Sequence, residues 1–124
     1  MIRSLFLVFA TFILMVTPAN AGGDIAAGKV VFEKCVFCHV QGNKINPIGP
    51  DLHGVVGRPV GSVTDYDYSY AMETFVITGT HWDEATLNDF LKEPVLYLKG
   101  TTMCGPAIRP EKERADLIAY LKSY

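Results

Sequence analysis

The sequence lacks the features that define several large classes of protein. Of its 124 residues, 11 are lysine or arginine and 13 are aspartate or glutamate, which gives a net charge of −2. Because nucleic acid is a polyanion, this balance gives no electrostatic reason to expect that the chain binds it. No run of like charge, internal repeat or low-complexity tract is present, which excludes a charged tail and a repeat architecture. The length suits one compact domain with a modest core.

Strand-like alternation of polar and apolar residues is also scarce. From Val40 to Thr64 the sequence is rich in glycine, proline and asparagine and shows no strand period. Such a long irregular segment is unusual in a small domain unless it wraps something. Short helices are expected on either side of it, at residues 24–34, 68–76, 83–92 and 110–122. We therefore predict an all-α fold of short helices and long loops, in which a large apolar cofactor completes a core that the helices alone leave too small.

The first and third predicted helices have recognisable ends. Asp24 is suited to cap the first helix at its N-terminus. Pro94 is expected to stop the helix over residues 83–92, and residues 95–109 are expected to form a loop. The apolar face of the first helix is predicted to contain Ile25, Gly28, Val31 and Phe32.

The last helix has the clearest pattern. Pro110 suits its first turn, Glu111 suits the positive N-terminal end of the helix, and Lys122 suits the negative C-terminal end. Apolar residues at helical spacing form a stripe that we expect to face the core. The stripe consists of Ala115, Leu117, Ile118 and Leu121.

The only long apolar run lies at the start of the chain. Arg3 precedes the stretch from Leu5 to Val16, Pro18 follows it, and Ala19-Asn20-Ala21 has small residues at the two positions that a signal peptidase reads. The stretch is shorter than the roughly 20 residues that span a bilayer. We predict a signal peptide over residues 1–21, cleavage after Ala21, a domain over residues 22–124 and a periplasmic location. A retained N-terminal anchor is the alternative.

The three cysteines do not suit a purely disulfide-based fold. Two of them stand in Cys35-Val36-Phe37-Cys38-His39, which is the attachment signature of c-type haem. Two thiols at this spacing can add to the two vinyl groups of one haem, and the next residue then supplies the proximal imidazole ligand of the iron. A disulfide redox pair, or half of a zinc site, is the alternative.

The iron then needs a second axial ligand. Met103 follows Gly100-Thr101-Thr102 in a loop that can fold back over the open face of the haem. A lone methionine more often fills a core, but a core methionine would be expected on a helix stripe. The other residues with suitable atoms are Met72, His53, His81 and Cys104.

With these residues in view, residues 23–123 resemble the small monohaem cytochromes c of mitochondria and their exported bacterial relatives. The resemblance implies the cytochrome c fold, one covalent haem c and axial ligation by His39 and Met103. It rests on separated anchors along the whole domain. They are Gly28-x-x-x-Phe32-x-x-Cys35-x-x-Cys38-His39, Gly49-Pro50-Asp51-Leu52-His53-Gly54-Val55-Val56-Gly57-Arg58, Tyr66-Asp67-Tyr68-Ser69, Trp82, Tyr97-Leu98-Lys99-Gly100-Thr101-Thr102-Met103 and Glu113-Arg114-Ala115-Asp116-Leu117-Ile118-Ala119-Tyr120-Leu121.

The resemblance also implies roles for residues around the haem. Pro50 matches the residue whose carbonyl accepts the ring N–H of the proximal histidine, and Gly28 matches a glycine that lets the first and last helices cross closely against Tyr120. Phe90 stands where the family usually has a tyrosine beside the methionine sulfur. The residues matched to the haem propionates are Arg58, Tyr68, Trp82 and Thr101.

Other departures concern the exposed edge of the haem. Cys104 follows Met103, where relatives carry a bulky apolar or aromatic residue, and is expected to pack as a small apolar side chain. Apolar or neutral residues replace lysines at Val95, Leu96 and Thr102, whereas Lys34, Lys44, Lys99 and Arg109 remain. Docking steered by a strong positive patch is therefore less secure, and a more apolar contact surface or a less acidic partner is the alternative.

Taken together, these features predict a monomeric one-electron carrier rather than an enzyme. It would dock briefly on larger electron-transfer proteins and take no small-molecule substrate. It would shuttle electrons between larger redox complexes, or between an exported dehydrogenase and its acceptor. An enzyme or gas-binding haem protein would need an open sixth coordination site, which Met103 argues against. An interaction module held by a metal, without haem, is the remaining alternative.

Overall fold

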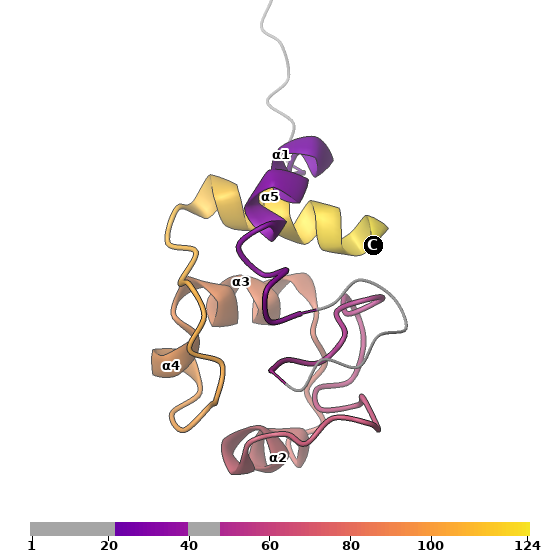
Figure 1. The fold of residues 1–124 in the computed structure, drawn as a ribbon, viewed down its shortest axis with the longest axis vertical. Helices are drawn as coiled ribbons and strands as arrows, with labels where there is room; N and C mark the ends of the chain where they lie inside the picture. The colour runs from indigo at the N-terminus through magenta and orange to yellow at the C-terminus, as the bar shows by residue number, and fades with distance from the viewer. Residues whose placement is uncertain (1–21, 40–47) are drawn as a thin grey trace, which may run out of the picture.

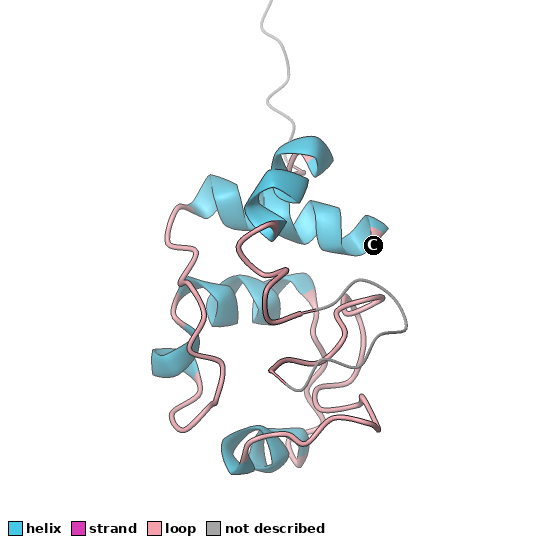
Figure 2. Cartoon of the chain, viewed as in Figure 1, coloured by secondary structure: helices cyan, strands magenta, loops and turns pink. Residues whose placement is uncertain are grey.

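The computed structural model describes residues 22–39 and 48–124. In these ranges the secondary structure is helical, with an isolated bridge between Pro59 and His81 and no strand, as predicted (Figure 2). The predicted signal peptide, and the part of the predicted irregular segment over residues 40–47, lie outside the described residues. The helices are α1 (Ile25–Phe32), α2 (Tyr70–Val76), α3 (Glu84–Lys92), α4 (Pro94–Tyr97) and α5 (Glu111–Ser123).

Helices α1 and α5 cross at one end of the molecule, α3 lies beneath them, and α2 lies at the opposite end (Figure 1). The crossing is close because Gly28 lies at it: a Cβ on Gly28 would collide with the backbone carbonyl of Asp116 and come within 2.8 Å of the Cβ of Tyr120. Glycine costs about 1 kcal/mol in a helix relative to alanine. Here that cost is offset by the close approach of the two backbones.

Asp116 fastens the start of α1 to α5. Its Oδ1 accepts the backbone N–H of Asp24 at 2.8 Å, and its Oδ2 accepts from Nζ of Lys112 at 2.7 Å. Asp24 in turn caps α1, because its carboxylate accepts the N–H of Ala27 at 3.0 Å. The predicted cap is confirmed, and it belongs to a hydrogen-bonded chain that links two helices distant in sequence.

A buried arginine joins α5 to α3. Arg114 is 5% exposed, and its Nε donates to Asn88 Oδ1 at 2.8 Å while its Nη1 donates to the carbonyl of Ile108 at 2.9 Å. A buried cation needs such partners to offset the loss of hydration. These contacts hold the segment before α5 against α3.

Three details of the predicted helices are corrected. Pro94 does not only end α3 but begins α4, because proline fits the first helical turn, where no N–H is required. Ile25 is 53% exposed, so it lies outside the buried face of α1, which consists of Gly28, Val31 and Phe32. Ala115 is also exposed, whereas Leu117, Ile118 and Leu121 are buried as predicted.

No helix within the described ranges has the length and apolar character needed to cross a membrane. The buried core joins α1, α2, α3 and α5 with loop residues. Its members are Val31, Phe32, Val55, Val60, Met72, Trp82, Leu87, Phe90, Leu91, Ile108, Leu117, Ile118 and Leu121.

The link through Asp116 makes a prediction about pH. The hydrogen bonds from Lys112 and from the N–H of Asp24 lower the pKa of Asp116 below its ordinary value of 3.8. A carboxylate with a lowered pKa contributes stability that is fully present above the unfolded value and is lost as the pH falls through the folded value. In denaturant titrations between about pH 5 and pH 2, Asp116→Asn should therefore show a smaller loss of unfolding free energy than the parent.

The control for this experiment is Asp65→Asn, because Asp65 is exposed. This variant should keep the parent's dependence on pH. Equal slopes for the parent and Asp116→Asn would contradict the role given to Asp116.

Candidate haem site

One apolar cavity lies among the helices and loops, with a volume of about 240 Å³. Its walls combine residues far apart in the sequence, from the segment after α1 to the inner face of α5. All the residues that the sequence analysis assigned to the site line it, namely Cys35, Cys38, His39, Pro50, Arg58, Tyr68, Trp82, Phe90, Thr101 and Met103.

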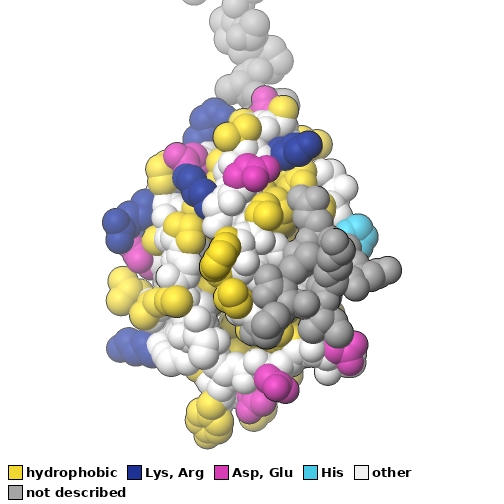
Figure 3. Space-filling view, in the orientation of Figure 1, with side chains coloured by type: hydrophobic (Ala, Val, Ile, Leu, Met, Phe, Trp, Pro, Cys, Tyr) yellow, Lys and Arg dark blue, Asp and Glu magenta, His cyan; other side chains and the backbone are white. Residues whose placement is uncertain are grey.

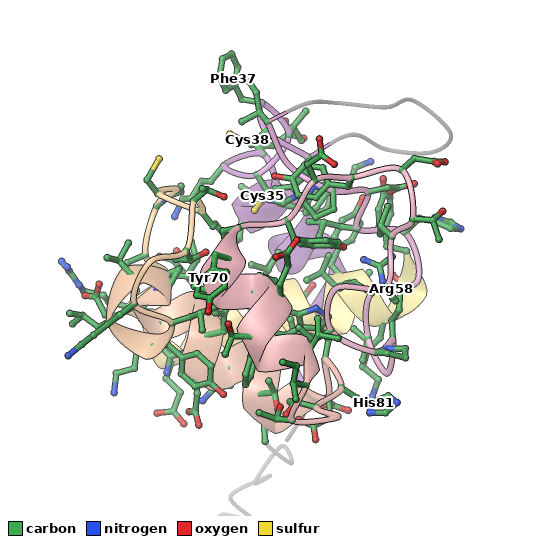
Figure 4. The ribbon with its side chains drawn as sticks, turned by 90° about the horizontal axis from the view of Figure 1, so that it is seen from below. Cys35, Phe37, Cys38, Arg58, Tyr70 and His81 are labelled. Carbon is green, nitrogen blue, oxygen red and sulfur yellow. The ribbon has the colours of Figure 1, made fainter. Side chains whose placement is uncertain are left out.

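The segment that follows α1 presents the two thiols and the imidazole. Backbone bonds from Cys38 N–H and His39 N–H to the carbonyl of Cys35, at 3.1 and 2.9 Å, coil this segment into tight turns. Figure 4 shows Cys35 and Cys38 close together on it, with Phe37 projecting outward. The turns therefore bring both sulfur atoms to the same side of the cavity. No cysteine among the described residues is in a disulfide.

Burial controls the protonation of this segment. It raises the pKa of the Cys35 thiol from 9.0 to about 11, with a further rise from Cys38 and an opposing effect of Lys34. Burial likewise lowers the pKa of His39 below 6.5, although the Pro50 carbonyl and Asp51 oppose this. His39 is therefore neutral at neutral pH, which is the form of imidazole that binds a metal.

The hydrogen bond of His39 fixes which of its nitrogens is free. Nδ1 lies 2.7 Å from the carbonyl oxygen of Pro50. Since a carbonyl oxygen can only accept, Nδ1 carries the proton and Nε2 keeps its lone pair. Gly49 lies against the same ring, because a Cβ there would be 2.8 Å from Cε1 of His39. The loop before Pro50 thus orients the imidazole from one side.

The loop between α4 and α5 supplies Met103. The N–H of Met103 donates to Oγ1 of Thr101 at 3.2 Å, and the N–H of Thr101 donates to the carbonyl of Leu98 at 3.0 Å. The Met103 side chain is half-buried and packs against the core. Hydrogen bonds within the loop therefore restrain it, and in this conformation the thioether side chain of Met103 lines the cavity.

Arg58 leaves one buried donor without a partner. Its two terminal nitrogens donate to the carbonyls of His53 and Asp51, at 3.1 and 2.9 Å. Its Nε is buried and has no hydrogen-bond partner among the described residues. A buried N–H without an acceptor destabilises the folded protein. A charged or polar acceptor bound in the cavity would remove this cost.

Aromatic residues form part of the wall of the cavity. Trp82 and Phe90 are buried, with ring centroids 5.0 Å apart. Tyr68 accepts the N–H of Val63 at its hydroxyl, at 3.3 Å, and burial raises the pKa of this phenol. Tyr66, which the sequence analysis gave no place in the site, also lines the cavity and packs edge-on against Tyr68 with centroids 4.9 Å apart.

The alternative ligands from the sequence fall into two groups. Met72 and Cys104 also line the cavity, and Met72 is buried. Cys104 is exposed, so the expectation that it packs as a small apolar side chain is wrong. His53 and His81 are exposed and lie outside the lining, and His53 packs instead against Tyr124. No group of three or more histidine, cysteine or acidic side chains in the described ranges is arranged to hold a metal ion, which leaves the zinc alternative without a site there.

The other apolar residues of the lining were not predicted to belong to the site. Some of them do lie on the apolar faces of helices that the sequence predicts. Leu117 and Leu121 were predicted to face the core, and they face this cavity. Leu87 and Leu91 belong to α3, whose buried face gives the same signal. The lining residues on loops, such as Val55 and Ile108, have no periodic pattern that would mark them.

An all-helical domain whose loops bring a Cys-x-x-Cys-His segment to an apolar cavity is typical of the class of small c-type haem proteins. Comparison with known proteins gives the family. The family model for cytochrome c matches residues 25–124, and the chain belongs to the cytochrome c family.

The relatives are both mitochondrial and bacterial in type. Cytochrome c type-1 of Ascaris suum is 41% identical over 106 residues, covering 85% of this chain and 92% of that protein. Cytochrome c-554 of Methylosinus trichosporium is 40% identical over 107 residues, covering 86% of this chain and 79% of the relative. The structure of cytochrome cH from Methylobacterium extorquens matches with a TM-score of 0.74 and 39% identity, over 82% of this chain and all of the other.

The family implies a covalent haem c, and the cavity fits such a group. Its lining is mostly apolar, as a porphyrin requires, and it contains the paired thiols of Cys35 and Cys38, a third thiol at Cys104, a neutral imidazole and the thioethers of Met72 and Met103. The unpartnered Nε of Arg58 adds a donor for a carboxylate of the kind that a haem propionate carries. This set of side chains is therefore compatible with a covalently attached haem.

The contact between Gly49 and His39 makes a prediction. In Gly49→Ala the new methyl would lie 2.8 Å from both Cε1 of His39 and the carbonyl oxygen of Cys38, so the ring or the loop must move. Overpacking of this kind costs about 1–3 kcal/mol. Chemical denaturation of the purified protein should show this loss.

Gly22→Ala provides the control, because a Cβ at Gly22 meets nothing within 4 Å and Gly22 is exposed and lies outside the cavity lining. It should unfold like the parent. If Gly49→Ala were as stable as Gly22→Ala, the imidazole would not be held as described.

Proposed function

We propose that this member of the cytochrome c family carries single electrons on one haem c that is bound through Cys35 and Cys38 and ligated by His39 and Met103. When bound, the haem supplies a reversible one-electron couple. The observation that carries the proposal is that the Cys35–His39 segment and Met103, which lie far apart in the sequence, line the same apolar cavity.

His39 and Met103 would fill both axial positions. The Pro50 carbonyl orients the His39 ring and makes it more basic, and Thr101 restrains the loop of Met103. With both positions taken by protein side chains, no substrate has to bind for the electron to move. This agrees with membership of a family of electron carriers, which are not enzymes.

The walls of the cavity would set the reduction potential. Buried apolar side chains such as Trp82 and Phe90 disfavour extra positive charge, and a thioether ligand also favours the reduced state. Arg58 would neutralise a propionate through its unpartnered Nε. Phe90 brings no hydroxyl to the Met103 side, unlike the tyrosine that the family resemblance leads one to expect at this position.

We further propose that the protein is exported and works in the periplasm as a monomer. The support is the Arg3 start, the apolar stretch from Leu5 to Val16 and the small residues before Gly22, which would become the first residue after cleavage. Larger electron-transfer proteins would act as donor and acceptor, through short-lived encounters that suit a small interface.

The axial assignment predicts a spectroscopic difference between two methionine variants. Met103→Leu should abolish the long-wavelength sulfur-to-iron absorption band of the oxidised protein and allow small ligands to bind, because a leucine side chain has no atom that can ligate iron. Met72→Leu is the matched control, since Met72 lines the same cavity and its replacement conserves volume. It should keep the band.

The assignment to Met103 is wrong if Met103→Leu retains the parent spectrum. Loss of the band in Met72→Leu alone would transfer the ligand role to Met72.

A further inference from the structure

The opening of the cavity is bordered by residues that both line it and are exposed. Among the described residues these are Lys34, Ile48, Thr102, Cys104 and Pro106, which we call the rim. Only Lys34 in this set carries a charge. The rim is where a partner protein would come nearest to the lining residues Cys35, Cys38 and Met103.

The charge of Lys34 is already neutralised within the molecule. Its Nζ lies 2.8 Å from Oε2 of Glu113 on α5. Arg109, another of the four cations that the family resemblance leaves near this edge, pairs with Glu93. Of the remaining two, Lys99 is exposed and Lys44 lies outside the described residues. An acidic partner would meet Glu113 and Glu93 together with Lys34 and Arg109, so it would gain little electrostatic attraction from these two cations.

Apolar side chains stand out at the same place. Phe37 lies between the two cysteines of the motif and is 81% exposed, and Ile48 of the rim is 54% exposed. Figure 4 shows Phe37 projecting outward from the segment that holds Cys35 and Cys38. In Figure 3, hydrophobic side chains are exposed near the middle of the described surface, among uncharged polar surface, and acidic and basic side chains lie above them and at the left and lower edges.

Isolated exposed apolar residues are ordinary, but these two adjoin the mouth of the cavity that holds the site. Because Lys34, the charged residue of the rim, is paired with Glu113, the exposed Phe37 is suited to burial against another apolar surface. Since Phe37 belongs to the haem-attachment segment, its burial would also bring a partner close to the two thiols.

We propose that the rim, with Phe37 as its anchor, docks on an electron-transfer protein whose contact surface is apolar and carries little net charge. The proposal rests on the proposed function and specifies the kind of partner. Association through buried apolar surface changes little with ionic strength, whereas association through complementary charge weakens as salt screens it.

Electrodes coated with alkanethiol monolayers provide partner surfaces of known chemistry. One surface ends in mixed methyl and hydroxyl groups, which imitate an apolar uncharged partner, and the other ends in carboxylates, which imitate an acidic one. The haem-containing protein is adsorbed on each, and the electroactive coverage is measured by cyclic voltammetry at low and high salt. The proposal predicts higher coverage on the methyl–hydroxyl surface, retained at high salt. Preference for the carboxylate surface, with release by salt, overturns it.

The anchor is tested by Phe37→Ser against Ile77→Ser. Ile77 is 84% exposed but lies outside the cavity lining. Phe37→Ser should weaken adsorption on the methyl–hydroxyl surface by roughly tenfold, which corresponds to about 1.4 kcal/mol. Ile77→Ser should leave it unchanged. Ile48→Ser, on the rim, gives a second reading that does not alter the attachment segment. Equal effects of Phe37→Ser, Ile48→Ser and Ile77→Ser contradict the proposal.

The ion pair is tested by Glu113→Gln against Glu84→Gln. Each variant removes one negative charge. Glu84 is the control because it also forms an ion pair, with Lys122 at 2.6 Å, and neither Glu84 nor Lys122 lines the cavity. Only Glu113→Gln frees Lys34 at the rim, so only it should acquire salt-sensitive adsorption on the carboxylate surface. Identical behaviour of the two variants counts against the rim as the contact.

Failure of the proposed function gives a different result. Without covalent haem, no redox wave appears on either surface and the denatured protein shows no haem stain. A haem-stained protein with a normal wave and a strong preference for the acidic surface would leave the carrier function intact and overturn only the inference about the partner.

Discussion

The close crossing of α1 and α5 is the constraint on which the other parts depend. Gly28 allows the two backbones to touch, and Asp116 fastens the start of α1 to α5 through the N–H of Asp24. Because the Cys35–His39 segment follows α1 directly, this crossing sets where the segment lies relative to α5. Leu117 and Leu121 of α5 line the cavity opposite the loops, so one helix contact positions both the attachment segment and part of the apolar wall.

The second determinant is that the helices do not fill the space between them. In a small domain, buried apolar area is scarce, and a cavity lined by apolar side chains forfeits the contacts that would stabilise it. A bound haem would restore these contacts and would provide an acceptor for the unpartnered Nε of Arg58. The cofactor would then be part of the core, which explains why a chain with such long loops can hold one structure.

Much of the helical framework could be predicted from the sequence, because caps and stripes are local signals. Asp24 and Asp83 were readable as the starts of α1 and α3, and both accept an N–H from the first turn of their helix. Pro94 was misleading because proline both stops one helix and opens another. Ile25 and Ala115 follow the apolar period but are exposed, since exposure depends on which partner lies opposite and not on spacing alone.

The site was predictable in a different way. The thiol pair and His39 form a local motif, but the contact of His39 with Pro50 joins two loops and was expected only through the family resemblance. The ion pair between Lys34 and Glu113 was not predicted at all, because nothing in the local sequence links a turn after α1 to a residue of α5 so far along the chain. The pairing matters for function, since it removes charge from the face that a partner would meet.

The most direct test of the central claim is a thiol titration of the purified, denatured protein. The chain has three cysteines, and thioether bonds to haem would leave only Cys104 to react. The account predicts one reactive thiol per chain in a coloured protein. Three reactive thiols in a colourless protein would contradict it.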